Sequence, residues 1–187
     1  MRATIYIGIG SNIGDRAGNI ISALSFLQSS GFVDIKTISR FYETSPIGPK
    51  QRKFYNIAVK AETKLNPQDL LILIKQAERL LGRKRSNHWG ARLIDIDILF
   101  YSNKCGKWKV ESGITQKATP HPALSRKGRG NDLIIPHEKI CDRLFVLVPL
   151  ASIAPNLNHP VFHRKIKQIL KGALLTLKGQ KVKIVTY

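Results

Sequence analysis

Two aspartates, one residue apart in an apolar stretch, are the strongest chemical signal in the chain. Alternation over residues 93–101 predicts a strand with Asp95, Asp97 and Leu99 on one face and Ile98 and Phe100 on the other. The two carboxylates then repel one another unless a cation joins them, and Mg²⁺ is commonly held by one or two carboxylates with water and nucleotide phosphates. The pair therefore indicates a magnesium site. An isolated Asp-x-Asp also occurs on the exposed face of an ordinary strand.

The segment just before this strand is basic. It contains Arg83, Lys84, Arg85, His88 and Arg92, together with Trp89. Arginine makes two parallel contacts with phosphate oxygens and neutralises the charge on a transferring phosphoryl group. The acidic pair beside these arginines favours phosphoryl transfer from a nucleotide. A basic run is also typical of a solvated loop or a nucleic-acid surface, but the carboxylates at its centre argue against contact with a phosphate backbone.

The elements that must position these side chains can be predicted from periodicity and turn signals. Apolar residues at helical spacing predict one helix over 15–28, and Asn66-Pro67 and Gly82 mark the start and end of a second. Strand patterns cover residues 4–9, 32–42, 54–61 and 93–101. The order β, α, β, β, α, β predicts an α+β fold, a ferredoxin-like split βαβ sandwich with a mostly antiparallel sheet and helices packed on one face.

The second half of the chain is more basic and less regular. Residues 102–132 have no periodicity and predict a long basic insertion. The stretches 142–155 and 162–175 predict two further helices, the second within a basic C-terminal segment, 163–187. The length of 187 residues predicts one domain, 1–187. No apolar run is long enough to span a membrane, and no secretory signal is recognisable, so we expect a cytoplasmic protein.

The net charge of +19 raises the possibility of nucleic-acid binding. Most of this charge lies in two segments, however. Residues 104–131 carry seven bases against one acid, and residues 164–183 carry seven bases and no acid, which leaves about +6 for the rest of the chain. That remainder is typical of an enzyme with a polyanionic substrate.

Several motifs in a fixed order point to one family. They are Tyr6 to Asn12, Thr44 to Gly48 before Phe54-Tyr55-Asn56, Glu78 ahead of Gly82, Trp89-Gly90-Ala91-Arg92 before the two aspartates, Ile135-Pro136-His137, and residues 143–150. Over about residues 3–160 the chain resembles the 6-hydroxymethyl-7,8-dihydropterin pyrophosphokinase family. The resemblance implies transfer of pyrophosphate from ATP to the hydroxymethyl group of the pterin, with release of AMP, in tetrahydrofolate biosynthesis.

The resemblance also implies a set of site residues. Asp95 and Asp97 would bind two Mg²⁺ ions shared with ATP, while Arg83 and Arg92 would act on the phosphates, Arg92 in the transition state. The residues implied to contact ATP are Lys75, Glu78, Arg83, Arg85, Trp89, Arg92, Ile98, His137 and Arg143. Those implied to hold the pterin are Thr44, Ile47, Phe54, Asn56, Asp95 and Phe145. The implied partners are ATP and the pterin, with no membrane or nucleic acid, and the implied state is a monomer.

Each weaker signal has an ordinary structural alternative. Phe54 and Phe145 are residue types usually found in the core, and His137 could be an ordinary loop histidine. The chain departs from the family pattern at Phe54, where a tyrosine is common, and at Asp132, where some members have an arginine. Two other functions remain open at this stage: an RNA-binding module on a split βαβ sheet, or an inactive relative whose insertion covers the site.

Overall fold

The computed structural model describes residues 1–48, 51–83, 92–102, 106–109 and 132–186. Two of the expected ATP contacts, Arg85 and Trp89, therefore lie outside the described residues. So does most of the expected insertion, 102–132. Within the described part, no helix is long and apolar enough to cross a membrane.

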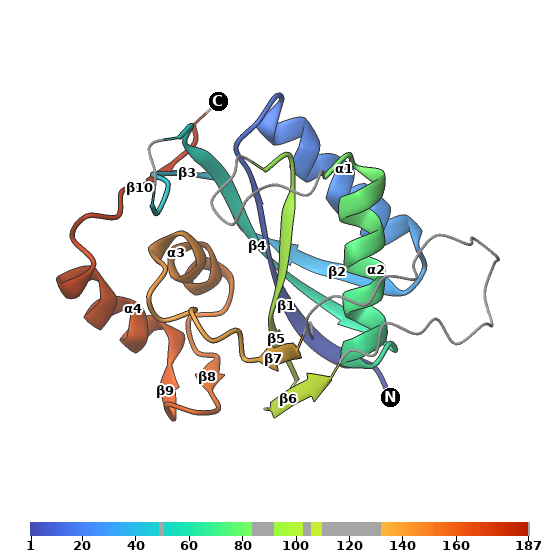
Figure 1. The fold of residues 1–187 in the computed structure, drawn as a ribbon. Coiled ribbons are helices and arrows are strands. Elements are labelled where there is room, and N and C mark those ends of the chain that lie inside the picture. Colours follow the sequence, from blue (N-terminus) through green and yellow to red (C-terminus); the bar gives the residue numbers. More distant parts are fainter. Residues whose placement is uncertain (49–50, 84–91, 103–105, 110–131, 187) are drawn as a thin grey trace.

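A six-stranded sheet forms the centre of the molecule, and all its neighbouring strands are antiparallel (Figure 1). The main path runs in the order β10-β3-β4-β1-β5, and β2 pairs with the far part of β4. The strands are β1 (Ala3–Ser11), β2 (Val33–Ile38), β3 (Tyr42–Thr44), β4 (Phe54–Thr63), β5 (Asp95–Tyr101) and β10 (Val182–Ile184). The strand that carries the two aspartates, β5, therefore lies at one edge of the sheet.

Helices cover both faces of this sheet. The first face carries α1 (Arg16–Ser29) and α2 (Pro67–Leu80), and the opposite face carries α3 (Leu144–Ile153) and α4 (Ile166–Thr176). The predicted α+β fold with an antiparallel sheet is confirmed. The prediction placed helices on one face, and the structure adds the second layer formed by α3 and α4.

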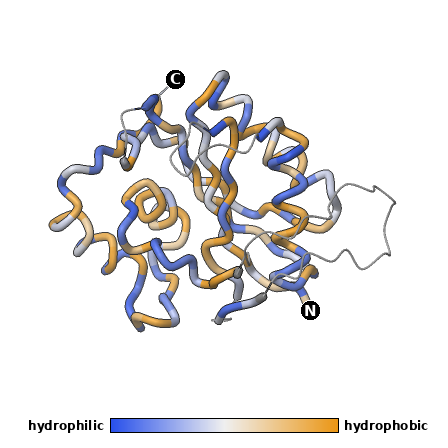
Figure 2. Tube along the Cα trace, in the orientation of Figure 1, coloured by the Kyte–Doolittle hydropathy of each residue, from blue (hydrophilic) through white to orange (hydrophobic). Residues whose placement is uncertain are grey.

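The two helical layers need a sheet that is apolar on both sides, and β1 shows how the sequence provides it. Ile5, Ile7 and Ile9 are almost fully buried against α1 and α2, whereas Tyr6 points to the other face, towards α3. Burying an isoleucine of this size contributes about 1.5–3 kcal/mol relative to leaving it exposed. Hydrophobic residues form one cluster on each face of the sheet, and Figure 2 shows them along the central strands and the helices on both sides.

The predicted alternation along β5 breaks at Leu99. The register pairs Ile98 with Ile7 but Phe100 with Tyr6, so that one extra residue, Leu99, is inserted. A β-bulge of this kind reverses the faces of the residues beyond it. As a result Leu99 and Phe100 both pack in the core under α3, and the prediction that Phe100 shares a face with Ile98 is wrong.

The helix that leads to β5 begins and ends at the predicted residues. The side chain of Asn66 accepts a hydrogen bond from the N–H of Asp69, and Pro67 occupies the first helical position. Gly82 follows α2 with a φ of 87°, a backbone conformation that residues other than glycine rarely adopt. These two signals fix the segment that delivers Glu78 and Arg83 to the edge of the sheet.

Two short hairpins complete the described structure. The first pairs β6 (Gly106–Lys109) with β7 (Asp132–Ile135), so the two ends of the predicted irregular insertion form strands. The second pairs β8 (Asn158–His159) with β9 (Arg164–Lys165) and leads into α4. Within the expected basic C-terminal segment, the predicted helix is confirmed as α4. The strand β10 that follows it was not predicted.

Candidate active site

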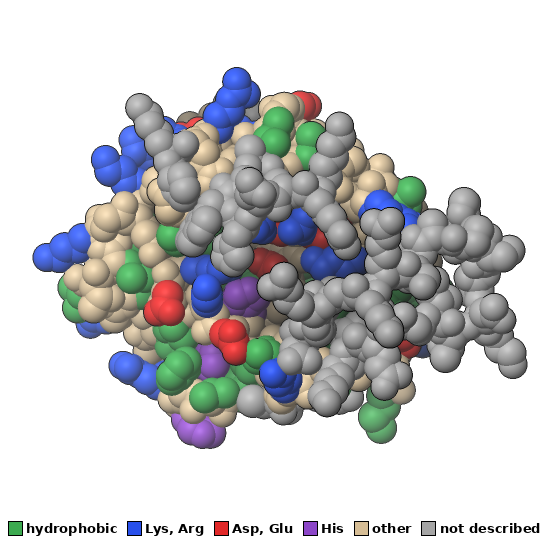
Figure 3. Space-filling model, in the orientation of Figure 1, with side chains coloured by type: hydrophobic (Ala, Val, Ile, Leu, Met, Phe, Trp, Pro, Cys, Tyr) green, Lys and Arg blue, Asp and Glu red, His purple; other side chains and the backbone are tan. Residues whose placement is uncertain are grey.

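A cavity of about 270 Å³ lies between β5 and the start of α3. Nine of the residues expected at the site line it: Thr44, Ile47, Phe54, Asn56, Arg92, Asp95, Asp97, Arg143 and Phe145. They come from β3, β4, β5, α3 and the segments beside them, which are far apart in the sequence. Figure 3 shows acidic, basic and histidine side chains gathered in the hollow between the two helical layers.

Asp95 and Asp97 lie two residues apart on β5, on the face of the strand that lines the cavity. Asp95 lies opposite Gly10 and Asp97 opposite Gly8 in the β1–β5 register. Because glycine has no side chain, no β1 side chain stands opposite either aspartate. The predicted placement of the two aspartates on one face is thus observed in the structure, in which both line the cavity.

The local environment disfavours negative charge on the second aspartate. Burial, together with the neighbouring carboxylate of Asp95, raises the pKa of Asp97 above its usual value. The guanidinium of Arg143 lies 4.0 Å from Asp97 and only partly offsets this effect. Burial also lowers the pKa of His137, which favours its neutral form. An added cation would therefore stabilise the ionised pair strongly.

The donor set suits a hard cation that brings other ligands with it. In the part of the chain that the structure describes, no cluster of three or more acidic, histidine or cysteine side chains could enclose a metal. Asp95 and Asp97 supply two carboxylates from one strand beside an open cavity. Mg²⁺ is commonly bound by one or two carboxylates and by substrate phosphates, so these residues fit a magnesium–nucleotide complex.

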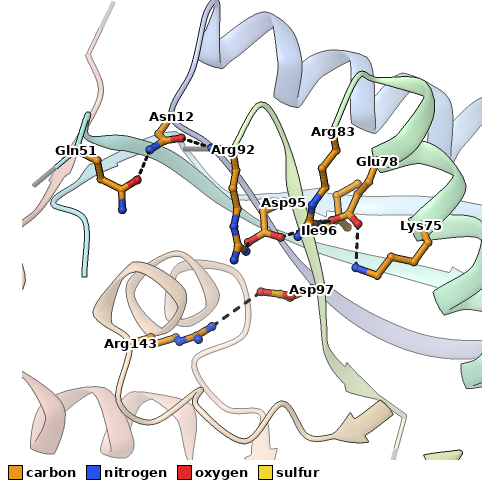
Figure 4. A network of polar contacts seen from close by, with 10 residues as sticks. All are labelled: Asn12, Gln51, Lys75, Glu78, Arg83, Arg92, Asp95, Ile96, Asp97 and Arg143. Carbon is orange, nitrogen blue, oxygen red and sulfur yellow. Dashed lines mark hydrogen bonds and ion pairs between the residues drawn. The ribbon is translucent and has the colours of Figure 1, made fainter. Parts of the chain in front are cut away.

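Two arginines flank Asp95 (Figure 4). Arg83 contacts one carboxylate oxygen at 2.8 Å, and Arg92 forms an ion pair with the other. The main chain of Arg92 is fixed separately. Its N–H donates to Asn12 Oδ1 at 2.7 Å, and its carbonyl accepts from the N–H of Asn12 at 3.1 Å. The Arg92 side chain can therefore change partners while its main chain stays in place.

Glu78 lies behind β5, outside the set of cavity-lining residues. Its carboxylate is nearly fully buried and accepts a hydrogen bond from the N–H of Ile96, the residue between the two aspartates, at 2.9 Å. It also accepts from Lys75 at 2.9 Å and forms an ion pair with Arg83. Both carboxylate oxygens of Glu78 therefore have partners within the protein. It joins α2 to the open edge of β5 and holds the acidic strand in place (Figure 4).

We expect Glu78→Ala to destabilise the fold. The change leaves the Ile96 N–H without its acceptor, and it removes the partner of Lys75 and one of the two acidic partners of Arg83. We expect a cost of about 3 kcal/mol in the free energy of unfolding. Chemical denaturation measures this. Glu62→Ala is the matched control, because Glu62 makes only exposed ion pairs at 3.8 Å, and such pairs contribute about 1 kcal/mol or less. Equal losses in the two variants would contradict the role given to Glu78.

Polar and aromatic side chains from β3, β4 and α3 line another part of the cavity. The side chain of Asn56 is buried and donates to Thr44 Oγ1 at 2.7 Å. A Cβ at Gly10 would lie only 2.5 Å from Asn56 Oδ1, so glycine is required there for the carboxamide to keep its orientation. Phe54 from β4 and Phe145 from α3 line the same space.

Other expected site residues lie beside the cavity. The side chain of Ile98 is buried in the core against α1 and α2, so contact with a ligand would involve its main chain. The N–H of His137 donates to the carbonyl of Leu99 at 3.2 Å, which places this histidine next to β5. Lys75 is half exposed on α2, where it pairs with Glu78.

Sequence reasoning missed several polar residues of the site, among them Asn12, Gln51 and Lys139. The Asn12 side chain donates to Gln51 Oε1 at 3.0 Å in addition to holding Arg92, and so connects the loops on two sides of the cavity. Gln51 and Lys139 both line the cavity. The sequence signal that could have identified Asn12 is its place at the end of the Tyr6–Asn12 motif. The structure shows that this polar residue is fully buried.

Sequence comparisons with known proteins all point to the same family. A model of the family described as 7,8-dihydro-6-hydroxymethylpterin-pyrophosphokinase (HPPK) matches residues 6–155. The 2-amino-4-hydroxy-6-hydroxymethyldihydropteridine pyrophosphokinase of Aquifex aeolicus is 36% identical over 167 residues, which are 89% of this chain and 89% of that protein. The protein of the same name from Bacillus subtilis is 38% identical over 154 residues, 82% of this chain and 79% of that protein.

Solved structures show the same fold in longer chains. A Plasmodium falciparum HPPK-DHPS structure with pterin and p-hydroxybenzoate aligns with 96% of this chain at a TM-score of 0.73 and 18% identity. This chain spans only 43% of that one. An HPPK-DHPS structure in complex with substrates aligns at a TM-score of 0.72 and 17% identity, over 95% of this chain and 44% of that one. At these identities the likeness is one of fold.

Proposed function

This chain belongs to the 7,8-dihydro-6-hydroxymethylpterin-pyrophosphokinase family, and we propose that its active site is the cavity between β5 and α3. As a member of this family, it is an enzyme that transfers pyrophosphate from ATP to 6-hydroxymethyl-7,8-dihydropterin in folate biosynthesis. One observation carries the proposal: the two carboxylates of β5, two arginines, two phenylalanines and a buried asparagine line a single cavity. In this proposal the phenylalanines and the asparagine bind the pterin, and the carboxylates and arginines bind ATP with its Mg²⁺ ions.

We propose that the pterin binds at the end of the cavity formed by β3, β4 and the start of α3. The rings of Phe54 and Phe145 provide apolar faces for the flat heterocycle. The Asn56 carboxamide, fixed by Thr44, offers a donor and an acceptor to the amide edge of the pterin. Ile47 adds apolar contact from the loop after β3.

ATP binds, in this proposal, along β5 and towards the arginines. Two Mg²⁺ ions held by Asp95 and Asp97 would add positive charge at the phosphate oxygens. Arg83 and Arg92, which contact Asp95 in the structure, exchange this carboxylate for phosphate oxygens when the nucleotide binds. Arg143 and His137 contact the nucleotide from the α3 side, and Arg85 and Trp89 from the segment before Arg92.

The reaction itself requires alignment and charge stabilisation. The hydroxymethyl oxygen of the pterin attacks the β-phosphorus of ATP and loses its proton, while the bond between the β-phosphorus and the oxygen that leaves with AMP breaks. Holding both substrates in one cavity brings the attacking oxygen and the phosphorus into line. The guanidinium of Arg92 spreads the charge that develops on the transferring group, and its main chain is fixed by Asn12.

Measurement of AMP formation tests the proposed function. The protein is incubated with ATP and Mg²⁺, with and without 6-hydroxymethyl-7,8-dihydropterin, and AMP is quantified. We expect AMP only when the pterin is present, in a one-to-one ratio with pterin pyrophosphate. If folded protein binds a nonhydrolysable ATP analogue yet forms no AMP with the pterin, the proposal is wrong, and the chain is an inactive member of the family.

We also propose that residues 1–187 act as one domain, as a monomer, in the cytoplasm. The described lining of the cavity comes from a single chain, so a second copy is not needed to form it. The C-terminal segment supports a single domain, because β10 joins the central sheet through β3. Sedimentation of the purified protein measures the oligomeric state.

A further inference from the structure

The C-terminal segment contacts both walls of the cavity, although it lies beyond the residues that match the family model. The Gln180 side chain makes two hydrogen bonds to the main chain at the start of α3. Its Nε2 donates to the carbonyl of Asp142 at 2.8 Å, and its Oε1 accepts from the N–H of Leu144 at 2.8 Å. The residue between these two contacts is Arg143, so Gln180 holds the main chain on both sides of Arg143.

The start of α3 depends on this contact because it has no side-chain cap of its own. Arg143 occupies the capping position and makes no side-chain hydrogen bond to the first turn. The first N–H groups of a helix have no partner within the helix and need an acceptor from elsewhere. Gln180 provides that acceptor to Leu144 from the C-terminal segment, across the fold.

The position of Arg143 matters for the site. Its guanidinium lies 4.0 Å from Asp97 and 5.5 Å from the centre of the Phe145 ring, and the residue lines the cavity. A rotation of the main chain at Arg143 would move the guanidinium relative to Asp97, and with it the positive charge that faces the nucleotide.

The residue after Gln180 reaches the other wall. The N–H of Lys181 donates to Ser45 Oγ at 3.0 Å, and its carbonyl accepts from the N–H of Ser45 at 3.0 Å. Val182 then pairs with Thr44, the partner of Asn56. The segment therefore connects the pterin end of the cavity with the start of α3, and Figure 1 shows β10 beside β3.

We propose that Gln180 is a positioning residue for Arg143, and that the C-terminal segment thereby sets the geometry of the nucleotide side of the site. This inference rests on the proposed function, because it takes Arg143 as a contact of ATP. Gln180 touches no substrate in this proposal. Its effect is transmitted through the main chain at Asp142 and Leu144.

A double-mutant cycle tests the inference. The native protein, Gln180→Ala, Arg143→Ala and the double variant are compared by calorimetric affinity for α,β-methylene-ATP with Mg²⁺, and separately by kcat and KM. We expect Gln180→Ala alone to weaken nucleotide affinity about tenfold, and the same change to have little further effect once Arg143 is absent. Lys178→Ala is the control, because Lys178 is exposed in the same segment; it should match the native protein.

One further variant, Gln180→Glu, and the outcomes that would overturn the inference complete the test. Gln180→Glu retains an acceptor for the Leu144 N–H and loses the donor to Asp142, so its loss of affinity should be smaller than that of Gln180→Ala. An equal loss from Gln180→Ala with and without Arg143, or no loss at all, would overturn the inference. If the native protein binds the analogue but forms no AMP, the proposed function fails, while the cycle in nucleotide affinity still tests the role of Gln180.

Discussion

Asp97→Asn is expected to lower the turnover number for pterin-dependent AMP formation by about a thousandfold or more, since a metal ion contributes several kcal/mol of charge stabilisation in the transition state. The substitution keeps the shape of the side chain on β5 but removes its charge. With Asp95 as the remaining carboxylate of the pair, the cavity holds Mg²⁺ less tightly. Steady-state rates over a series of Mg²⁺ concentrations measure both effects.

The stability of this variant separates loss of the site from loss of the fold. The pKa of Asp97 is raised in the folded protein, so ionisation of this group costs stability as the pH rises from its ordinary pKa through the raised value. In Mg²⁺-free buffer above that window, Asp97→Asn should therefore melt at the same temperature as the native protein or higher. Asp34→Asn is the matched control, because Asp34 pairs with Arg2 and Lys36 on the surface. It should leave the rate unchanged. A slow Asp97→Asn variant that also melts much earlier would instead indicate general damage.

The sequence was sufficient to predict the parts of the site that follow from local rules. Alternation along a strand placed Asp95 and Asp97 on one face, and helix signals at Asn66 and Gly82 bounded the segment that delivers Arg83. Motif order brought Asn56 into the same site, and the structure places it in the same cavity as the two aspartates. The strand and helix features depend on residues close together in the chain, where periodicity and capping rules apply, whereas Asn56 was assigned through the family resemblance.

What could not be predicted depends on pairing between distant segments. The bulge at Leu99 arises from the register of β5 against β1, and a single strand pattern contains no information on that register. Glu78 could be placed on a helix, but its bond to the Ile96 N–H exists only because α2 packs beside the open edge of β5. Gln180 is a further case, since its partners at α3 lie far back in the sequence.

The alternative of an RNA-binding module rested on the split βαβ sheet and on the net charge, whereas the family match shows a pterin pyrophosphokinase. Five basic residues of the C-terminal segment lie on β9, α4 and β10, and no described basic side chain of the segment is among those that line the cavity. The arginines at the cavity are in contact with acidic side chains. Among the described residues, the basic side chains of the site are therefore separate from those of the C-terminal segment.

Arg92→Lys is expected to lower kcat by about a hundredfold, because lysine keeps the charge but lacks the planar fork that contacts two phosphate oxygens at once. Affinity for a nonhydrolysable ATP analogue should change much less, since the interaction strengthens mainly in the transition state. The substitution is well suited to the test. Asn12 bonds to the main chain of Arg92, so the segment stays anchored when the side chain changes.

The comparison that decides the role of Arg92 is the ratio of the two effects. Arg2→Lys, at a surface ion pair with Asp34, is the matched control and should change neither kcat nor affinity. If Arg92→Lys weakened binding of the analogue as much as it lowered kcat/KM, with kcat unchanged, Arg92 would serve to bind ATP in its ground state. A loss confined to kcat would mean that the guanidinium acts on the transferring group, and that its contact with Asp95 is the resting arrangement from which it is released.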